Sequence, residues 1–177
     1  EGTDPEFMHI LQRSIFGEVC YVGSADNRMR ELITVTVLTV CQTLPQLKAH
    51  TAACLHVGVT PSEIREAAYQ CAPFIGFPKT LNAIAAMNEV FAENGISLPL
   101  AAVGSTSEED RMRRGAELQT ALYGDEIKDR YKWLPGDFAQ AVPNWLTGVG
   151  FGDLATRGVL SGKDRELLTV VLLAAIG

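Results

Sequence analysis

Glu31 and His50 are the residues of this sequence whose types and spacing allow acid–base chemistry. Glu31 lies within an apolar run, and a buried carboxylate has to be ion-paired, hydrogen-bonded or neutral. One interpretation is structural, an ion pair with Arg28 or Arg30 or a contact with a helix N-terminus. The other is functional, an acid or base that exchanges a proton with His50. The sequence leaves both interpretations open.

Two polar residues precede His50 at helical spacings. Gln46 lies one turn before His50 and Thr43 nearly two turns before it, so the three side chains share one face of a helix. The corner at 43–45 contains a proline and places the N-terminus of that helix beside the same face. Backbone N–H groups at a helix N-terminus favour an anion, such as a substrate carboxylate. We therefore expect these residues and Glu31 to form a site for a small acid.

The elements that position these residues are expected to be helices. Residues 27–42 are rich in β-branched side chains, but they run without Gly or Pro for longer than a typical strand and suit a buried central helix. A second helix is expected over 44–57. Residues 60–63 (TPSE) have the pattern of a capping box and open a third helix, and a fourth is expected over 79–94. The short connections between them predict an all-α fold.

The second half of the chain is also expected to be helical. Ser107 and the acidic residues after it are expected to start a helix that ends at Tyr123. Another helix is expected over 138–149, interrupted by Pro143. The apolar run at 164–177 has nothing in the sequence to cover it, so we expect either a longer chain or packing against another subunit.

The end of the chain repeats the segment around Glu31. Subtracting 31 from 166 gives an offset of 135, at which Arg165-Glu166-Leu167 faces Arg30-Glu31-Leu32. Phe151-Gly152-Asp153 faces Phe16-Gly17-Glu18 at the same offset. Matches in one register predict an internal duplication. We expect a first repeat over residues 8–96, a linker over 97–106 and the incomplete start of a second repeat over 107–177.

Charge and hydropathy limit the class of partner. The net charge of −6, with no basic cluster, argues against nucleic acid and anionic membranes as partners. The apolar segments are broken well short of the ~20 residues that a membrane span requires. Residues 1–7 (EGTDPEF) precede Met8 and resemble an expression-vector remnant, so we leave them out of the fold prediction.

The cysteines and histidines do not predict a metal or redox site. The four cysteines show no CxxC and no metal-ligand spacing, and we expect them to be small buried residues in a reducing, cytoplasmic compartment. A disulfide or redox pair is the other interpretation. His9, His50 and His56 form no recognisable ligand set with a carboxylate, and His56 is expected at the surface end of a helix. We expect neither a metal nor a cofactor.

Several motifs together resemble the carboxymuconolactone decarboxylase family. They are RELI, QLKAH, GVTPSEI and QCAPFIGFPKTLNA, within Phe16 to Val90. In the second half, GAELQTALYGDE and GFGDLATRGVL resemble the front half of such a domain. The resemblance implies an all-α bundle of the alkylhydroperoxidase-D-like type, present in tandem. It also implies a homo-oligomer, commonly a trimer or hexamer, that assembles through pairs of helices.

The resemblance implies two activities, one of which needs thiols. In the alkylhydroperoxidase-D type, a glutamate, a CxxC pair and a histidine form a proton relay and a redox dithiol. At that spacing this sequence has Glu31, Thr43, Gln46 and His50, so neither cysteine position carries sulfur. A thiolate is the required nucleophile of such chemistry, and we therefore expect no peroxidase activity from this set.

The other implied activity is cofactor-free decarboxylation of a carboxylated butenolide. Loss of carbon dioxide leaves a dienolate, which is stabilised through the lactone carbonyl and then reprotonated. The resemblance implies that His50 delivers the proton, that Glu31 orients or shares it, and that Thr43 or Gln46 donates hydrogen bonds to the lactone. The pocket wall would contain Gly76, Phe77, Pro78 and Asn82, for which a purely structural corner is the other interpretation. A non-catalytic oligomeric module that binds a small acid stays open as a third function.

Overall fold

The described part of the chain is built from helices. The computed structural model describes residues 4–177, apart from the side chain of Lys128. Within that range no strand is present, which confirms the all-α class, and no helix is both long and apolar enough to cross a membrane. The elements in chain order are α1 (Pro5–Leu11), η1 (Gln12–Glu18), η2 (Val19–Tyr21), α2 (Asn27–Cys41), α3 (Leu44–His56), α4 (Pro61–Tyr69), α5 (Ala72–Ile75), α6 (Phe77–Glu93), α7 (Arg111–Tyr123), η3 (Asp125–Asp129), α8 (Phe138–Trp145), η4 (Leu146–Ala155) and α9 (Gly162–Ile176).

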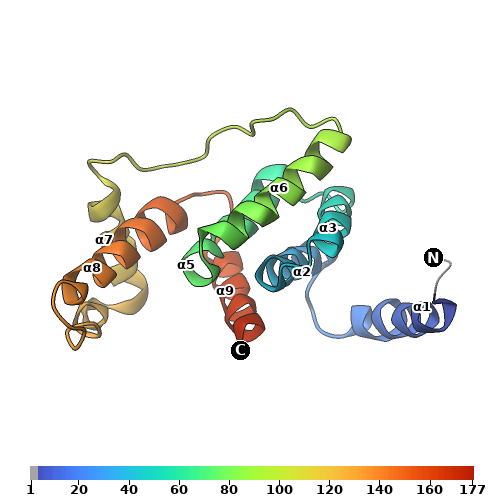
Figure 1. Ribbon diagram of the computed structural model, residues 1–177, viewed down its shortest axis with the longest axis horizontal. Coiled ribbons are helices and arrows are strands. Elements are labelled where there is room, and N and C mark those ends of the chain that lie inside the picture. Colours follow the sequence, from blue (N-terminus) through green and yellow to red (C-terminus); the bar gives the residue numbers. More distant parts are fainter. Residues whose placement is uncertain (1–3) are drawn as a thin grey trace.

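Helix α2 is the central helix of the first half, as its apolar composition predicts. It packs against α3, α4, α6 and α9 (Figure 1). Leu32 of α2, Leu47 of α3 and Ile64 of α4 have no exposed surface, and Phe91 of α6 has 1%. Full burial of such side chains contributes about 1.5–3 kcal/mol each. The Asp26 side chain accepts a hydrogen bond from the Met29 N–H at 2.8 Å and so caps the start of α2.

Helix α4 begins with the predicted capping box. Thr60 Oγ1 accepts a hydrogen bond from the Glu63 N–H at 3.3 Å, and Glu63 Oε2 accepts one from the Thr60 N–H at 2.8 Å. Arg28 donates to Glu63 Oε1 at 2.6 Å and to Asp164 Oδ2 at 3.5 Å. These ion pairs join the starts of α2, α4 and α9.

The ion pair and hydrogen bonds of Glu63 lead us to predict that the folded protein loses stability in acid. Burial acts to raise the pKa of Glu63, but hydrogen bonds from Arg28 and Thr60 outweigh it and lower the pKa from 4.5. A carboxyl group with a lowered folded-state pKa stabilises the fold above its unfolded pKa, and this contribution is lost as pH falls through the folded value. We therefore expect the free energy of unfolding to decrease when the pH is lowered below about 4.5. This decrease is expected to be smaller in Glu63→Gln, which has no carboxyl group to protonate. Urea denaturation at about pH 6 and about pH 3 measures this, and equal losses in both proteins would contradict it.

The second half is held together by close backbone contact between α7 and η4. A Cβ atom on Gly115 would lie 2.2 Å from the Thr147 carbonyl oxygen, and one on Gly152 would lie 2.4 Å from that of Arg111. Both positions therefore require glycine. Arg111 also forms an ion pair with Asp153 across the same contact. The π-helix η4 ends at Ala155, beyond the expected end of the helix at residue 149.

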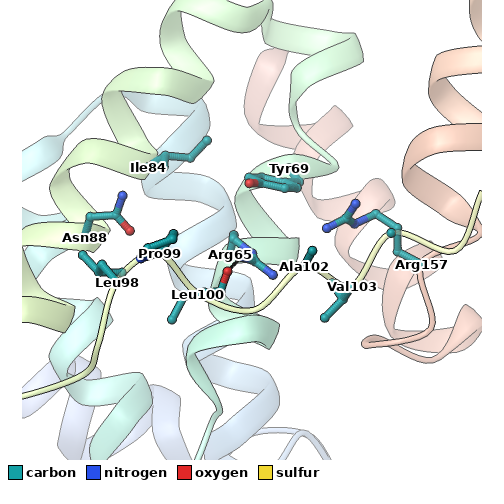
Figure 2. Close-up of a pocket in the computed structure, with 11 residues that line it drawn as sticks. Arg65, Tyr69, Ile84, Asn88, Leu98, Pro99, Leu100, Ala102, Val103 and Arg157 are labelled. Carbon is teal, nitrogen blue, oxygen red and sulfur yellow. Dashed lines mark hydrogen bonds between the residues drawn. The ribbon is translucent and has the colours of Figure 1, made fainter.

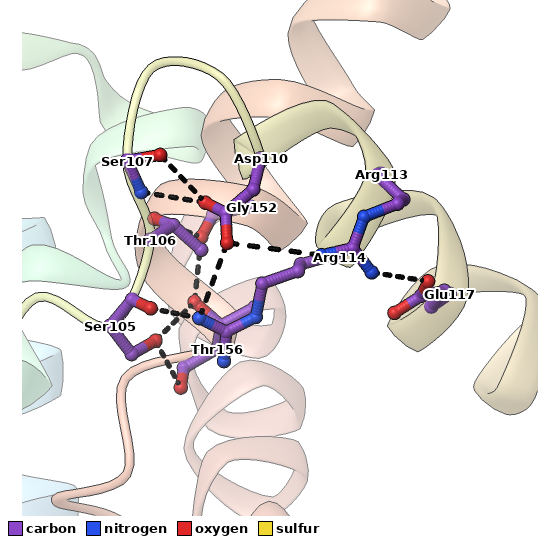
Figure 3. A network of polar contacts seen from close by, with 9 residues as sticks. All are labelled: Ser105, Thr106, Ser107, Asp110, Arg113, Arg114, Glu117, Gly152 and Thr156. Atoms are coloured by element: carbon purple, nitrogen blue, oxygen red, sulfur yellow. Dashed lines mark hydrogen bonds and ion pairs between the residues drawn. The ribbon is translucent and has the colours of Figure 1, made fainter.

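Helix α7 starts later than predicted. Ser107 does not begin the helix, because the Asp110 side chain accepts a hydrogen bond from the Ser107 N–H at 2.6 Å and closes a turn ahead of it. The helix begins at Arg111. Figure 3 shows this turn together with Thr106, whose hydroxyl donates to the Gly152 carbonyl oxygen at 3.1 Å. The turn thus fastens the start of α7 to η4.

Residues 97–106 contain no helix and connect α6 to α7 across the molecule (Figure 1). We call this segment the strap. Arg65 binds it by donating a hydrogen bond to the Ala101 carbonyl oxygen at 2.9 Å. The Arg65 and Arg157 guanidinium carbons lie 5.6 and 5.2 Å from the centre of the Tyr69 ring, and both arginines line a pocket beside the strap (Figure 2). The strap is therefore packed on α4, and its role as a linker between repeats stays a prediction.

A buried ion cluster joins the two halves. The Glu66 side chain, on α4, has no exposed surface. Arg157 Nε donates to both of its carboxylate oxygens at 2.9 and 3.0 Å, and Arg165 Nη2 of α9 donates to one of them at 3.1 Å. The sequence analysis did not anticipate this cluster.

Helix α9 lies where the 135-residue offset requires it. Helix α2 covers 27–41 and α9 covers 162–176. Asp26 caps the first and Ser161 caps the second, again 135 residues apart. The π-helices η1 and η4 also correspond at this offset. These coincidences are what a duplication predicts, and the duplication and its boundaries stay predictions.

The first helices form an arm beside the bundle (Figure 1). Residues 5–7, expected to be foreign, form the first turn of α1, where the Asp4 side chain caps the Phe7 N–H at 3.0 Å. Residues 1–3 lie outside the described range. The arm exposes several large apolar side chains, among them Phe7, Phe16, Tyr21 and Val22.

Candidate functional site

The structure brings Glu31 and His50 together. Glu31 lies on α2 and His50 on the neighbouring α3, and His50 Nδ1 is 2.8 Å from Glu31 Oε2. The side chains are 21% and 36% exposed, so the pair is half-buried but reachable from solvent. Arg28 pairs with Glu63 instead, and Arg30 donates to backbone carbonyl oxygens. The geometry therefore favours coupling to His50 over an ion pair with either arginine.

This contact suits proton transfer. When Nδ1 of His50 carries the proton that is donated to Glu31, Nε2 has a free lone pair and acts as a base. When both nitrogens are protonated, the carboxylate stabilises the imidazolium and Nε2 has a proton to deliver. In the described residues, no group of three or more His, Cys, Asp or Glu side chains lies close enough to hold a metal ion. The contact therefore has the geometry that a general acid or general base requires.

Thr43 and Gln46 lie on the same helix as His50. Thr43 is the N-cap residue of α3, and its side chain makes no capping hydrogen bond. Gln46 is exposed one turn before His50. The first turn of α3 therefore combines two polar side chains with backbone N–H groups that no side chain caps.

The other predicted pocket residues lie at the start of α6. Gly76 has a φ of +85° and ends α5, and Pro78 fits the first turn of α6, so this helix starts at Phe77 rather than at Lys79 as predicted. Phe77 is 65% exposed. Asn82 Nδ2 donates to Gln42 Oε1 at 3.1 Å. Asn82 is therefore brought to the α2–α3 corner, where Gln42 directly precedes Thr43, and its described hydrogen bond is structural.

Gln42 is the residue of this corner that the sequence analysis missed. It ends α2 in the left-handed conformation with a φ of 57°, where glycine or asparagine is usual. Its Nε2 donates to the Lys79 carbonyl oxygen at 3.0 Å while Oε1 accepts from Asn82. The signal available in the sequence was its place between the end of one helix and the proline-containing start of the next.

The cysteines are free thiols, and two of them are buried. Cys54 follows His50 by one turn on α3, and burial, together with the charges of Glu31 and Glu63, raises its pKa to about 12. Burial alone raises the pKa of Cys71 to about 12. Both thiols therefore stay protonated near neutral pH and are poor nucleophiles. Cys20 and Cys41 are exposed, contrary to the expectation that all four would be buried.

Two comparisons with known proteins bear on the first half of the chain. The carboxymuconolactone decarboxylase family model matches residues 5–89. A 4-carboxymuconolactone decarboxylase from Acinetobacter baylyi is 30% identical over 92 residues, which cover 52% of this chain and 69% of the relative. The chain belongs to the carboxymuconolactone decarboxylase family. The resemblance drawn from the motifs within residues 16–90 is thereby confirmed, while that of the second half stays a prediction.

The family match includes the helices of the site. Residues 5–89 contain α2 and α3 with Glu31 and His50, and also the start of α6 with Asn82. Residues 90–177, which hold α7, η4 and α9, lie outside that match. The candidate site thus belongs to the part of the chain that carries the carboxymuconolactone decarboxylase signature.

Proposed function

We propose that this chain is a cofactor-independent carboxy-lyase that acts on a small carboxylated lactone, with His50 and Glu31 as its proton-transfer pair. The observation that carries the proposal is the 2.8 Å contact between His50 Nδ1 and Glu31 Oε2 within the family-matched helices. The substrate class is supported by the Acinetobacter baylyi relative, whose name is 4-carboxymuconolactone decarboxylase.

The proposed reaction begins with cleavage of the bond between the ring and its carboxylate. Carbon dioxide leaves, and the electron pair of that bond spreads into the lactone as a dienolate with negative charge on the carbonyl oxygen. His50 Nε2–H then delivers a proton to carbon. Glu31 accepts the hydrogen bond from Nδ1–H and stabilises the imidazolium until the proton is transferred.

The start of α3 is proposed to hold the substrate. Its uncapped backbone N–H groups carry the positive end of the helix dipole and favour the substrate carboxylate. Gln46 or Thr43, on the same helix as His50, donates a hydrogen bond to the lactone carbonyl. In this assignment Gly76, Phe77, Pro78 and Asn82 shape the neighbouring wall.

The alternative redox function has less support. The positions of a CxxC pair are Thr43 and Gln46, and the nearby thiol of Cys54 is held protonated by burial. We further propose a homo-oligomer in the cytoplasm. Exposed apolar side chains on α6 and α9, such as Phe77, Leu81 and Val170, support self-association through helices.

The experiment that tests this function is incubation with a carboxylated muconolactone in D₂O buffer containing EDTA. We expect one carbon dioxide released per molecule converted and one solvent deuterium bound to carbon in the product. The same lactone without its carboxylate serves as the control and releases none. Failure to release carbon dioxide at equimolar protein and lactone would contradict the proposal.

A further inference from the structure

The pocket beside the strap has the size of a small-molecule site. Its volume is about 670 Å³. The strap forms part of its wall, and Tyr69 of α4 and Asn88 of α6 contribute from the first half of the chain. Arg157, from the segment between η4 and α9, lies at one end of the lining and Asn88 at the other (Figure 2). Neither Glu31 nor His50 lines this pocket, so it is separate from the candidate active site.

The pocket lies beside more positive than negative charge. Arg157 and Arg165 share the single carboxylate of Glu66. Arg65 donates to two carbonyl oxygens of the strap at 3.4 and 2.9 Å, and it forms no ion pair with a described residue. The guanidinium groups of Arg65 and Arg157 also lie against the same ring, that of Tyr69. Three guanidinium groups are thus balanced by one carboxylate, and the surplus charge attracts an anion into the pocket.

The polar atoms available to a ligand in this pocket are both unpaired and accessible. Arg157 uses Nε for Glu66, at 2.9 and 3.0 Å, while its Nη1 and Nη2 make no hydrogen bond with a described residue. The same is true of Tyr69 Oη and the side-chain amide of Asn88 within the described range. None of these atoms is among the described polar atoms that are buried without a partner, so each keeps surface open to solvent. Figure 2 shows the guanidinium group of Arg157 directed along the pocket towards Tyr69.

We propose that this cavity, the strap pocket, is a second ligand site that takes a small organic carboxylate with an apolar body. The carboxylate accepts hydrogen bonds from Arg157 Nη1 and Nη2 and offsets the surplus charge beside Arg65. The apolar body packs against Ile84 and Pro99, which line the pocket towards Asn88. The lining residues at the Asn88 end carry no charge, so one carboxylate suits the site better than two. The proposal does not depend on decarboxylase activity.

Benzoate, benzamide and acetate are the probes that test it. Benzoate and benzamide have nearly the same shape, and only benzoate is charged. In isothermal titration or ligand-observed NMR with the full chain, we expect benzoate to bind at least about tenfold more tightly than benzamide, as hydrogen bonds between charged groups would give. Acetate has the charge without the ring, and we expect it to bind at least about tenfold more weakly than benzoate.

Ala102 provides the variants that locate the binding. It is exposed on the strap and lies between Arg65 and Arg157 in the lining (Figure 2). Ala102→Glu supplies a carboxylate of the protein's own to these arginines and is expected to lower the affinity for benzoate at least about tenfold. Ala102→Gln is the matched control, because its side chain has nearly the same size and no charge, and it is expected to lower the affinity far less. Circular dichroism checks that both variants keep their helices.

Several results would overturn the proposal. One is no detectable binding of benzoate, and another is an affinity for benzamide or acetate equal to that for benzoate. Benzoate binding that Ala102→Glu leaves unchanged would place the anion elsewhere, such as at the start of α3. Equal losses in Ala102→Glu and Ala102→Gln would show that the added size, and not the added charge, displaces the probe. None of these measurements uses lactone turnover, so failure of the proposed function would not alter their outcome.

Discussion

Replacing Glu66 by alanine is expected to lower the free energy of unfolding by about 3–5 kcal/mol. The Glu66 side chain has no exposed surface, and those of Arg157 and Arg165 are 14% and 10% exposed. Removing the carboxylate leaves two nearly buried guanidinium groups without their counter-charge. Because Arg157 and Arg165 belong to the second half of the chain, the loss also weakens the junction between the halves.

Urea denaturation followed by circular dichroism measures this effect. The matched control is Glu89→Ala, which removes a surface ion pair between Glu89, 58% exposed, and Lys48, 41% exposed. This change is expected to lower the free energy of unfolding by less than about 1 kcal/mol. A variant with Glu66, Arg157 and Arg165 all replaced by methionine is expected to be more stable than Glu66→Ala, because no buried charge is left unpaired. Equal stability of Glu66→Ala and Glu89→Ala would show that the buried cluster does not hold the halves together.

Replacing His50 by alanine is expected to lower kcat/KM for the carboxylated lactone by about 10²–10⁴-fold, the contribution typical of a positioned general acid or base. The reason is that His50 contacts Glu31 through Nδ1 and so keeps its second ring nitrogen, Nε2, to deliver a proton to the substrate. The measurement is steady-state release of carbon dioxide by His50→Ala and by the unchanged chain.

His56→Ala is the control for this prediction. His56 lies on the same helix, is exposed in its last turn, and is expected to be replaceable without loss of kcat/KM. Imidazole added to the buffer is expected to restore part of the activity of His50→Ala, because the free base occupies the vacated space. Equal losses in both histidine variants would place the proton-transfer group elsewhere.

The sequence was sufficient for the parts of the fold that depend on local chemistry. The capping box of Thr60 and Glu63 and the central position of α2 follow from neighbouring residues, and both are confirmed. The start of α7 was misplaced, because Ser107 and Asp110 form a turn rather than a helix cap. Whether such residues form a turn or cap a helix depends on the packing of α7 on η4, which the local sequence does not specify.

The Glu31–His50 pair was predictable because its residues stand within a compact family motif, only 19 positions apart. The Glu66 cluster was not, since its arginines lie 91 and 99 positions away and no local pattern links them. Gln42 was missed for a related reason. Its bridge to Lys79 and Asn82 depends on how α6 packs against the α2–α3 corner, which no periodicity within one helix reveals.

A double-mutant cycle on Glu31 and His50 tests the central claim most directly, namely that these residues act as one proton-transfer unit. The quantity to measure is kcat/KM for the carboxylated lactone in the unchanged chain, Glu31→Gln, His50→Ala and the double variant. We predict that the double variant is no slower than His50→Ala alone, because the carboxylate acts only through the imidazole. Losses that multiply in the double variant would contradict this account and show that the 2.8 Å contact is not the catalytic coupling.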